Sequence, residues 1–186
     1  MNLAQRKDPS EETAANGPSG NRPSGTAPTR RSTARLAAVQ ALYQMEMGGL
    51  GADAVVSAFL RDRLGHEAGD QAYADADPEL FARIVRGTAA DREELDDMIA
   101  AVLSDDLDVD RLETLLRIVL RAGIHELSRH FDIPARVTIS EYVDIADAFY
   151  DRRETGLVNA VLDRIGRALR VEELEGTPGG RTPLAG

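Results

Sequence analysis

Three arginines near residue 30 are the side chains of this sequence best suited to contact an anionic partner. Arg30, Arg31 and Arg35 open a predicted helix, and no acidic residue occurs between Glu12 and Glu46. The planar guanidinium group matches phosphate oxygens and the edge of guanine. Because the whole chain carries a formal net charge of -10, this basic helix start indicates a localised anionic partner, with nucleic acid as the first candidate.

The predicted helix would place these side chains at one site. Arg31 and Arg35 are four residues apart and are expected on one helix face, with Arg30 beside them in the connecting coil. The amides and the positive dipole end of a helix start also attract phosphate. The alternative is that these arginines are only solvated at the helix start. The lack of acidic residues around them favours binding of an anionic partner. For Tyr43, further along the same helix, stacking on a base and packing in the core both remain open.

Patterns typical of enzymes and metal sites are missing from the sequence. It contains no cysteine, no P-loop, no GxGxxG motif and no GxSxG motif. His125 and His130 are five positions apart and fall on different helix faces, so a shared metal is not expected. The acidic segment 104–110 lacks the central glycine and the distal glutamate of an EF-hand loop. We therefore expect neither catalysis nor a bound cofactor or metal.

Composition divides the 186 residues into one domain and two polar ends. Residues 1–28 and 172–186 hold six of the eight prolines and few large apolar side chains. Such segments cannot bury enough surface to offset chain entropy, so we expect them to be disordered around a domain at 29–171. No apolar run approaches the roughly 18 residues of a membrane helix, and the N-terminus does not resemble a signal peptide. The lack of cysteine is compatible with the cytoplasm, where we expect the protein to act.

Apolar residues at helical spacing predict an all-α fold. Asp77 before Pro78 is a typical helix start, and Thr138 with Glu141 forms a capping-box pattern. Gly87 inside the third predicted helix would allow a bend or a close helix crossing. The predicted helices span 31–47, 53–64, 77–102, 109–130, 138–149 and 154–170. We expect a compact bundle of six to seven helices around one core.

Two segments resemble the NusB family of bacterial transcription antitermination factors. The stretch RRSTARLAAVQALY, from Arg30 to Tyr43, is similar to the family's N-terminal arginine-rich motif. Between Val119 and Ile165, the elements LR, EL, DIP, ISE and VNAVLD occur in the order and at the separations typical of the family. The resemblance covers about 30–170, and it implies an all-helical fold of two small subdomains without catalysis.

The resemblance also implies partners and RNA-facing residues. Members of the family pair with NusE, a small-subunit ribosomal protein, and the two together bind the boxA element in the leader of ribosomal RNA transcripts. That complex joins NusA, NusG and RNA polymerase, and elongation then resists premature termination. The positions that the resemblance places at the RNA are Arg30, Arg31, Arg35, Gln40, Tyr43 and Leu157, where Leu157 replaces a common phenylalanine.

One alternative function remains open at this point. Ser32 and Thr33 stand where basic residues are common in the family, so the arginine-rich motif is thinner here. The overall acidity of the chain is a second reason to consider a function that does not depend on RNA. The alternative is a helical protein-interaction module, such as a homodimer, without intrinsic RNA specificity.

Overall fold

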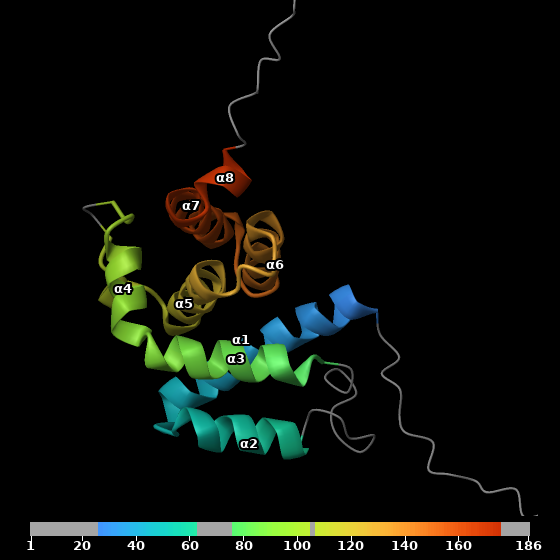
Figure 1. The fold of residues 1–186 in the computed structure, drawn as a ribbon. Coiled ribbons are helices and arrows are strands. Elements are labelled where there is room, and N and C mark those ends of the chain that lie inside the picture. Colours follow the sequence, from blue (N-terminus) through green and yellow to red (C-terminus); the bar gives the residue numbers. More distant parts are fainter. Residues whose placement is uncertain (1–25, 63–75, 105–106, 176–186) are drawn as a thin grey trace, which may run out of the picture.

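Helices are the only regular elements within residues 26–62, 76–104 and 107–175, which the structure, a computed structural model, describes (Figure 1). This confirms the all-α prediction. The helices are α1 (Ala27–Gly48), α2 (Ala52–Asp62), α3 (Pro78–Ala90), α4 (Arg92–Ala100), the 3-10 helix η2 (Val109–Arg111), α5 (Thr114–Arg129), α6 (Ala135–Asp147), α7 (Arg152–Leu169) and α8 (Val171–Leu174). No helix in these ranges is long and apolar enough to cross a membrane. Of the two ends predicted to be disordered, residues 1–25 and 176–186 lie outside the described residues.

Two groups of helices share one core. Helices α1, α2 and α3 pack on one another, while α5, α6 and α7 form a second group that α8 joins. Helix α1 lies against α5 and α6, and α3 lies against α5, so α1 and α5 connect the groups (Figure 1). The core is built mainly from Leu, Ile, Val and Ala side chains. The first helix is therefore held by both groups, which fixes the position of its arginines.

Small residues let the neighbours of α1 and α3 approach closely. Ala34, Ala37, Ala38 and Ala41 of α1 are fully buried. A Cβ atom added to Gly87 of α3 would lie 2.1 Å from the His125 ring, so Gly87 marks the close helix crossing that the sequence allowed. At the end of α1, Gly49 adopts φ 63, the left-handed conformation that commonly stops a helix.

Three predicted helix boundaries are wrong. The helix predicted across 77–102 is interrupted at Asp91, where α3 ends and α4 begins. The helix predicted from Val109 starts at Thr114, because Glu113 accepts the amides of the first turn of α5. The capping box is also incorrect, since α6 starts at Ala135 and places Thr138 inside the helix. There the Thr138 hydroxyl donates to the carboxylate of buried Glu126 instead of capping an amide.

The predicted C-terminal tail begins with ordered residues. Helix α8 covers Val171–Leu174, and Leu174 is buried against the core. Its side chain also lies beside Gly166 of α7, where an added Cβ would come within 3.0 Å of it. The packed chain therefore continues past the boundary that composition suggested.

Candidate nucleic-acid interface

The start of α1 presents an exposed cationic end. Arg31 is exposed and forms no ion pair with any described residue. No acidic side chain occurs in the first turn of α1. Arg30 is partly buried, and its backbone carbonyl accepts the amide of Asp77 at 3.0 Å, which ties the start of α1 to the start of α3. The positive end of the helix dipole adds to the attraction for phosphate here.

Arg35 does not share this exposed face, contrary to the sequence-based prediction. Its side chain is 1% exposed. Its Nε donates to both carboxylate oxygens of Glu126 at 3.0 Å, and its Nη2 donates to Oε1 at 2.6 Å. Its Nη1 lies 3.3 Å from Oε2 of Glu141. A guanidinium held in this way cannot reach an RNA phosphate, so the predicted direct contact of Arg35 is corrected to a structural role.

Glu126 is the centre of this buried cluster. It is fully buried and also accepts the hydroxyls of Thr138 and Tyr142, the latter at 3.1 Å. Burial alone would lower the pKa of Arg35, but the hydrogen bond and the charge of Glu126 raise it above its ordinary value. Burial, reinforced by the charge of Glu126, raises the pKa of Tyr142 well above its ordinary range. The cluster therefore fastens a charged α1 residue to α5 and α6.

A second contact sets how α1 lies beside α6. The Ser32 hydroxyl donates to Oε1 of Glu141 at 2.8 Å, next to the Arg35 contact with the same carboxylate. Further along, Tyr43 of α1 and Phe149 after α6 line one hollow. Glu141 therefore fixes the start of α1 against α6, and the hollow lies further along the chain from both of these contacts.

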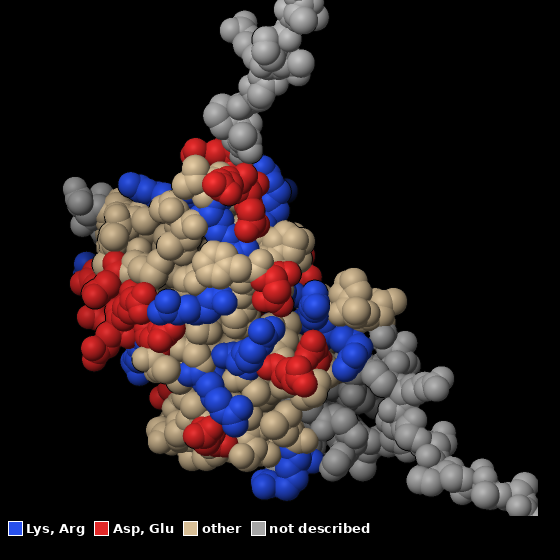
Figure 2. Space-filling model, viewed as in Figure 1, with Lys and Arg blue, Asp and Glu red and all other residues tan. Residues whose placement is uncertain are grey.

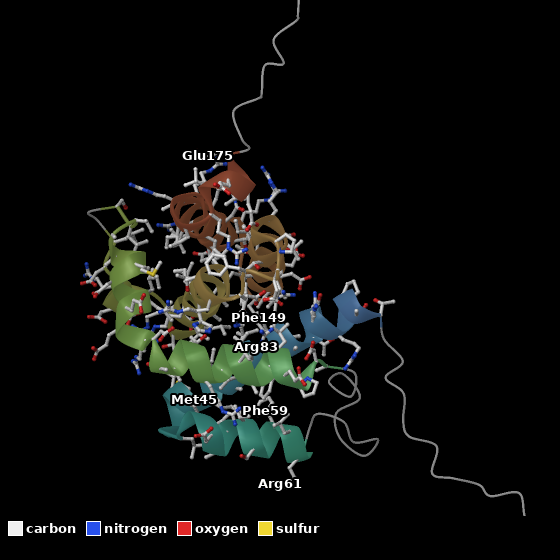
Figure 3. The ribbon with its side chains drawn as sticks, viewed as in Figure 1. Met45, Phe59, Arg61, Arg83, Phe149 and Glu175 are labelled. Carbon is white, nitrogen blue, oxygen red and sulfur yellow. The ribbon has the colours of Figure 1, made fainter. Side chains whose placement is uncertain are left out.

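That hollow brings together two of the predicted RNA-facing residues, Gln40 and Tyr43. It measures about 260 Å³ and is lined by Val39, Gln40, Tyr43, Gln44, Leu115 and Phe149. Tyr43 is 38% exposed and Phe149, which is labelled in Figure 3, is 47% exposed. Single-stranded RNA is commonly recognised by aromatic rings that stack on bases and by polar groups that read base edges. The two rings and the glutamine amides offer both kinds of contact.

Phe149 is the residue of this hollow that sequence reasoning missed. Its spacing from Tyr142 and Ile145 matches the apolar face of a helix, which by itself does not distinguish Phe149 from a core residue. The structure ends α6 at Asp147 and places Phe149 in the following turn. The spacing of apolar residues could not predict that Phe149 lies outside the helix, because it does not determine the residue at which a helix ends.

Leu157, the last of the predicted site residues, does not join the hollow. It is partly buried on α7 and packs against the core. It lies four residues after Arg153, so the two side chains share a face of the helix.

A group of exposed acidic side chains lies on α4. Glu93, Glu94 and Asp97 of α4 are exposed, and Figure 2 shows a concentration of acidic residues over α4, at the left of the view. A polyanion is repelled there, although the chain as a whole is acidic. Within the described ranges, no group of three or more His, Asp or Glu side chains is arranged to hold a metal.

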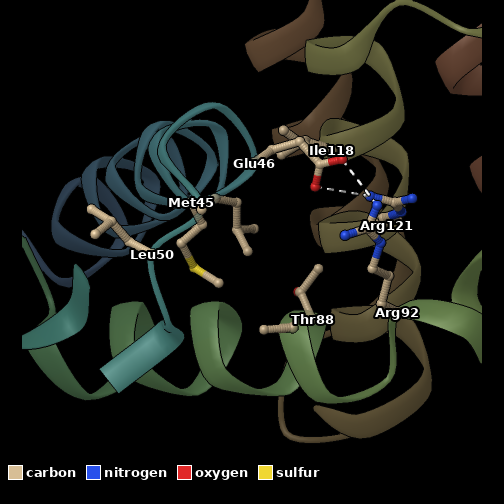
Figure 4. A pocket seen from close by; sticks show the side chains of 10 residues that line it. Met45, Glu46, Leu50, Thr88, Arg92, Ile118 and Arg121 are labelled. Carbon is tan, nitrogen blue, oxygen red and sulfur yellow. Dashed lines mark hydrogen bonds and ion pairs between the residues drawn. The ribbon is translucent and has the colours of Figure 1, made fainter. Parts of the chain in front are cut away.

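Another hollow, of about 350 Å³, lies at the C-terminal end of α1 (Figure 4). Its charged groups pair with one another. Glu46 accepts Arg92 at 2.9 Å and lies 3.8 Å from Arg121, which itself pairs with Asp96 at 2.7 Å. None of the predicted RNA-facing residues lines it. We therefore assign this hollow to an ion-pair network that links α1, α4 and α5.

Comparisons with known proteins agree with the fold. The family model described as NusB family matches residues 32–167. A transcription antitermination protein NusB from Bradyrhizobium diazoefficiens is 49% identical over 144 residues, which cover 77% of this chain and 87% of the relative. One from Rhizobium johnstonii is 48% identical over 151 residues, covering 81% and 94% of the two chains. Among solved structures, T. maritima NusB aligns with a TM-score of 0.64 and 30% identity, covering 81% of this chain and 98% of that one.

Proposed function

The chain belongs to the NusB family of transcription antitermination proteins, and on this basis we propose that it binds the boxA element of ribosomal RNA leader transcripts together with NusE. We propose further that this complex acts with NusA, NusG and RNA polymerase in the cytoplasm to keep ribosomal RNA transcription from terminating early. The chain has no catalytic part in this function.

The observation that carries the proposal is that one helix, α1, presents an exposed cationic residue near its start and an exposed aromatic residue further along. Arg31 and Tyr43 are both exposed on α1, twelve residues or about 18 Å apart along the helix axis. RNA that lies along α1 therefore meets a cationic end first and the Tyr43–Phe149 hollow next. The arginines contribute affinity through phosphates, while the hollow reads bases.

A partner protein fits the charge distribution. The formal net charge of -10 limits the affinity of this chain alone for RNA. A basic partner bound beside the α1 face would supply further positive charge to the same RNA. This supports shared recognition with NusE, since two proteins then divide the phosphate contacts.

The proposal is tested by titrating labelled boxA RNA and a scrambled RNA with the full chain, with and without NusE, and following fluorescence anisotropy. We expect tighter binding of boxA than of the scrambled RNA. The variant Arg30→Gln/Arg31→Gln should bind both RNAs more weakly and with a smaller salt dependence, because phosphate contacts release counterions. Substitution of Tyr43 or Phe149 by Leu should instead reduce RNA affinity without changing its salt dependence. Stacking is worth about 1–3 kcal/mol per base, so the loss should be roughly 5- to 150-fold.

Equal affinity for the two RNAs, unchanged by all of these substitutions in folded protein, would contradict the proposal. A stable homodimer that buries α1 and ignores boxA RNA even with NusE present would favour the alternative, a protein-interaction module. Circular dichroism melting curves of each variant provide the control for folding.

A further inference from the structure

We propose that Arg152 and Arg153, in the first turn of α7, bind RNA phosphates on the far side of the Tyr43–Phe149 hollow. The RNA path would then have a cationic group at each end, with the stacking hollow between them. This inference rests on the proposed RNA-binding function and extends it to two residues outside the arginine-rich motif.

Most arginines of the described ranges are already neutralised by a carboxylate. Arg35, Arg86, Arg121 and Arg129, for example, each pair with Asp or Glu at 3.2 Å or less. The described arginines that form no ion pair are Arg31, Arg111, Arg136, Arg152, Arg153 and Arg164. In a chain with a net charge of -10, an unpaired guanidinium is a group that remains available to an external anion.

The arginines at the start of α7 stay unpaired although acids surround them. Asp151 precedes them and Glu154 follows them in the sequence, yet neither carboxylate forms an ion pair with Arg152 or Arg153. Both arginines are exposed. By contrast, Arg136 and Arg164 donate to the backbone carbonyls of Leu174 and Val102. Arg152 and Arg153 therefore form a pair of adjacent guanidinium groups without a partner among the described residues.

The position of this pair follows from the turn that joins α6 to α7. Phe149 lines the hollow, and Arg152 is three residues further on, so their Cα atoms are at most about 11 Å apart. The Tyr150 hydroxyl donates to Glu113, the N-cap of α5, while Leu115 two residues later lines the same hollow. The turn is thus fastened to the wall of the hollow, which keeps the arginines beside it.

Because Arg35 is buried, Arg152 and Arg153 would supply phosphate contacts that Arg35 cannot make. Arg35 of the α1 motif is held by Glu126 and Glu141, so it adds nothing to the phosphate contacts of Arg31. A strand that leaves the hollow away from Arg31 meets the α7 arginines next. Phosphate contacts position the RNA without reading its sequence. Arg152 and Arg153 should therefore strengthen boxA and scrambled RNA binding equally.

The experiment compares two variants of the full chain that lose the same charge. Arg152→Gln/Arg153→Gln removes the proposed contacts and keeps a good helix former at each position. The matched control is Arg136→Gln/Arg164→Gln. Arg136 is the second residue of α6, at the end opposite Phe149, and Arg164 lies about 17 Å along α7 from Arg153. Binding of boxA and scrambled RNA is measured by anisotropy at about 50 mM and about 200 mM salt, with melting curves to verify folding.

Loss of two single-strand phosphate contacts lowers the slope of log affinity against log salt by about 1.4. Over this fourfold change in salt, the wild type should lose about sevenfold more affinity than the Arg152→Gln/Arg153→Gln variant. The control should keep the wild-type slope, and the ratio of boxA to scrambled affinity should stay unchanged in both variants.

Two other results would overturn the inference, and they differ in what they mean for the proposed function. If the wild type prefers boxA and Arg30→Gln/Arg31→Gln weakens binding, but the α7 variant behaves like the control, only the α7 contacts are excluded. If the wild type shows no preference for boxA with or without NusE, both the proposed function and this inference fail.

Discussion

Removing Arg35 should destabilise the protein more than any other single arginine substitution in α1. In Arg35→Met, the carboxylate of Glu126 stays fully buried but loses the guanidinium that neutralises it. The hydroxyls of Thr138 and Tyr142 remain as its donors. Breaking a buried ion pair by removing one partner costs about 3–5 kcal/mol. For a domain of this size that corresponds to a fall in Tm of about 6–20 °C.

A second substitution isolates the cause of this loss. In Arg35→Met/Glu126→Gln, position 126 carries no charge, and its amide oxygen still accepts a hydroxyl from Thr138 or Tyr142. The double variant should therefore be more stable than Arg35→Met alone, although it differs from the wild type at one more residue. Such a result would show that the two positions are coupled, because the second substitution would restore stability instead of adding a further loss.

Urea denaturation at pH 7 measures the free energy of unfolding of the wild type and both variants. The reasoning is refuted if Arg35→Met costs less than about 1 kcal/mol, or if the double variant is no more stable than the single one. The same proteins test the role of Arg35 in RNA binding. Where the double variant is folded, it should bind boxA RNA almost as well as the wild type. If Arg35 contacted a phosphate directly, the double variant would instead bind the RNA more weakly.

Three further predictions concern α3, α5 and the end of α7. Burial lowers the pKa of His125, against the opposing effect of Asp91, and also lowers the pKa of His130. Below about pH 6.5 the unfolded chain therefore binds protons that the folded protein does not. The free energy of unfolding should decrease as the pH is lowered through this range, and His130→Gln should make that decrease smaller in urea titrations. Gly87→Ala should cost about 1–3 kcal/mol in thermal denaturation, because its Cβ would meet the His125 ring; an unchanged Tm would exclude this close crossing. Arg170→Ala should cost about 3 kcal/mol, since Arg170 is buried and donates to three backbone carbonyls, those of Leu127 in the last turn of α5 and of His130 and Ile133 after it. The control is Arg167→Ala, which removes an exposed ion pair.

The helices could be predicted from the sequence where local chemistry determines them. Asp77 and Pro78 start α3 as expected, because the Asp77 carboxylate accepts the amides of Glu79 and Leu80. The capping box at Thr138 failed because tertiary contacts competed with the local pattern. Inside the fold, the Thr138 hydroxyl is used to satisfy Glu126, a residue twelve positions earlier in the chain.

The candidate site was only partly predictable for the same reason. The composition of the α1 start correctly indicated an exposed basic end at Arg31. Helical spacing also put Arg35 on that face, but spacing does not reveal that Glu126 and Glu141 from other helices lie behind it. Phe149 reaches the hollow only because α6 ends two residues before it. Both differences come from contacts between segments far apart in the sequence.

The central claim, that RNA lies along α1 and over the hollow of Tyr43 and Phe149, is tested most directly by cross-linking. Ultraviolet irradiation of the full chain with boxA RNA and NusE, followed by mass spectrometry of the linked peptides, maps the residues that touch bases. We expect cross-links at Tyr43 and Phe149 that a tenfold excess of unlabelled boxA RNA removes. Cross-links confined to the acidic α4 face or to the hollow at Glu46, with none at Tyr43 or Phe149, would contradict it.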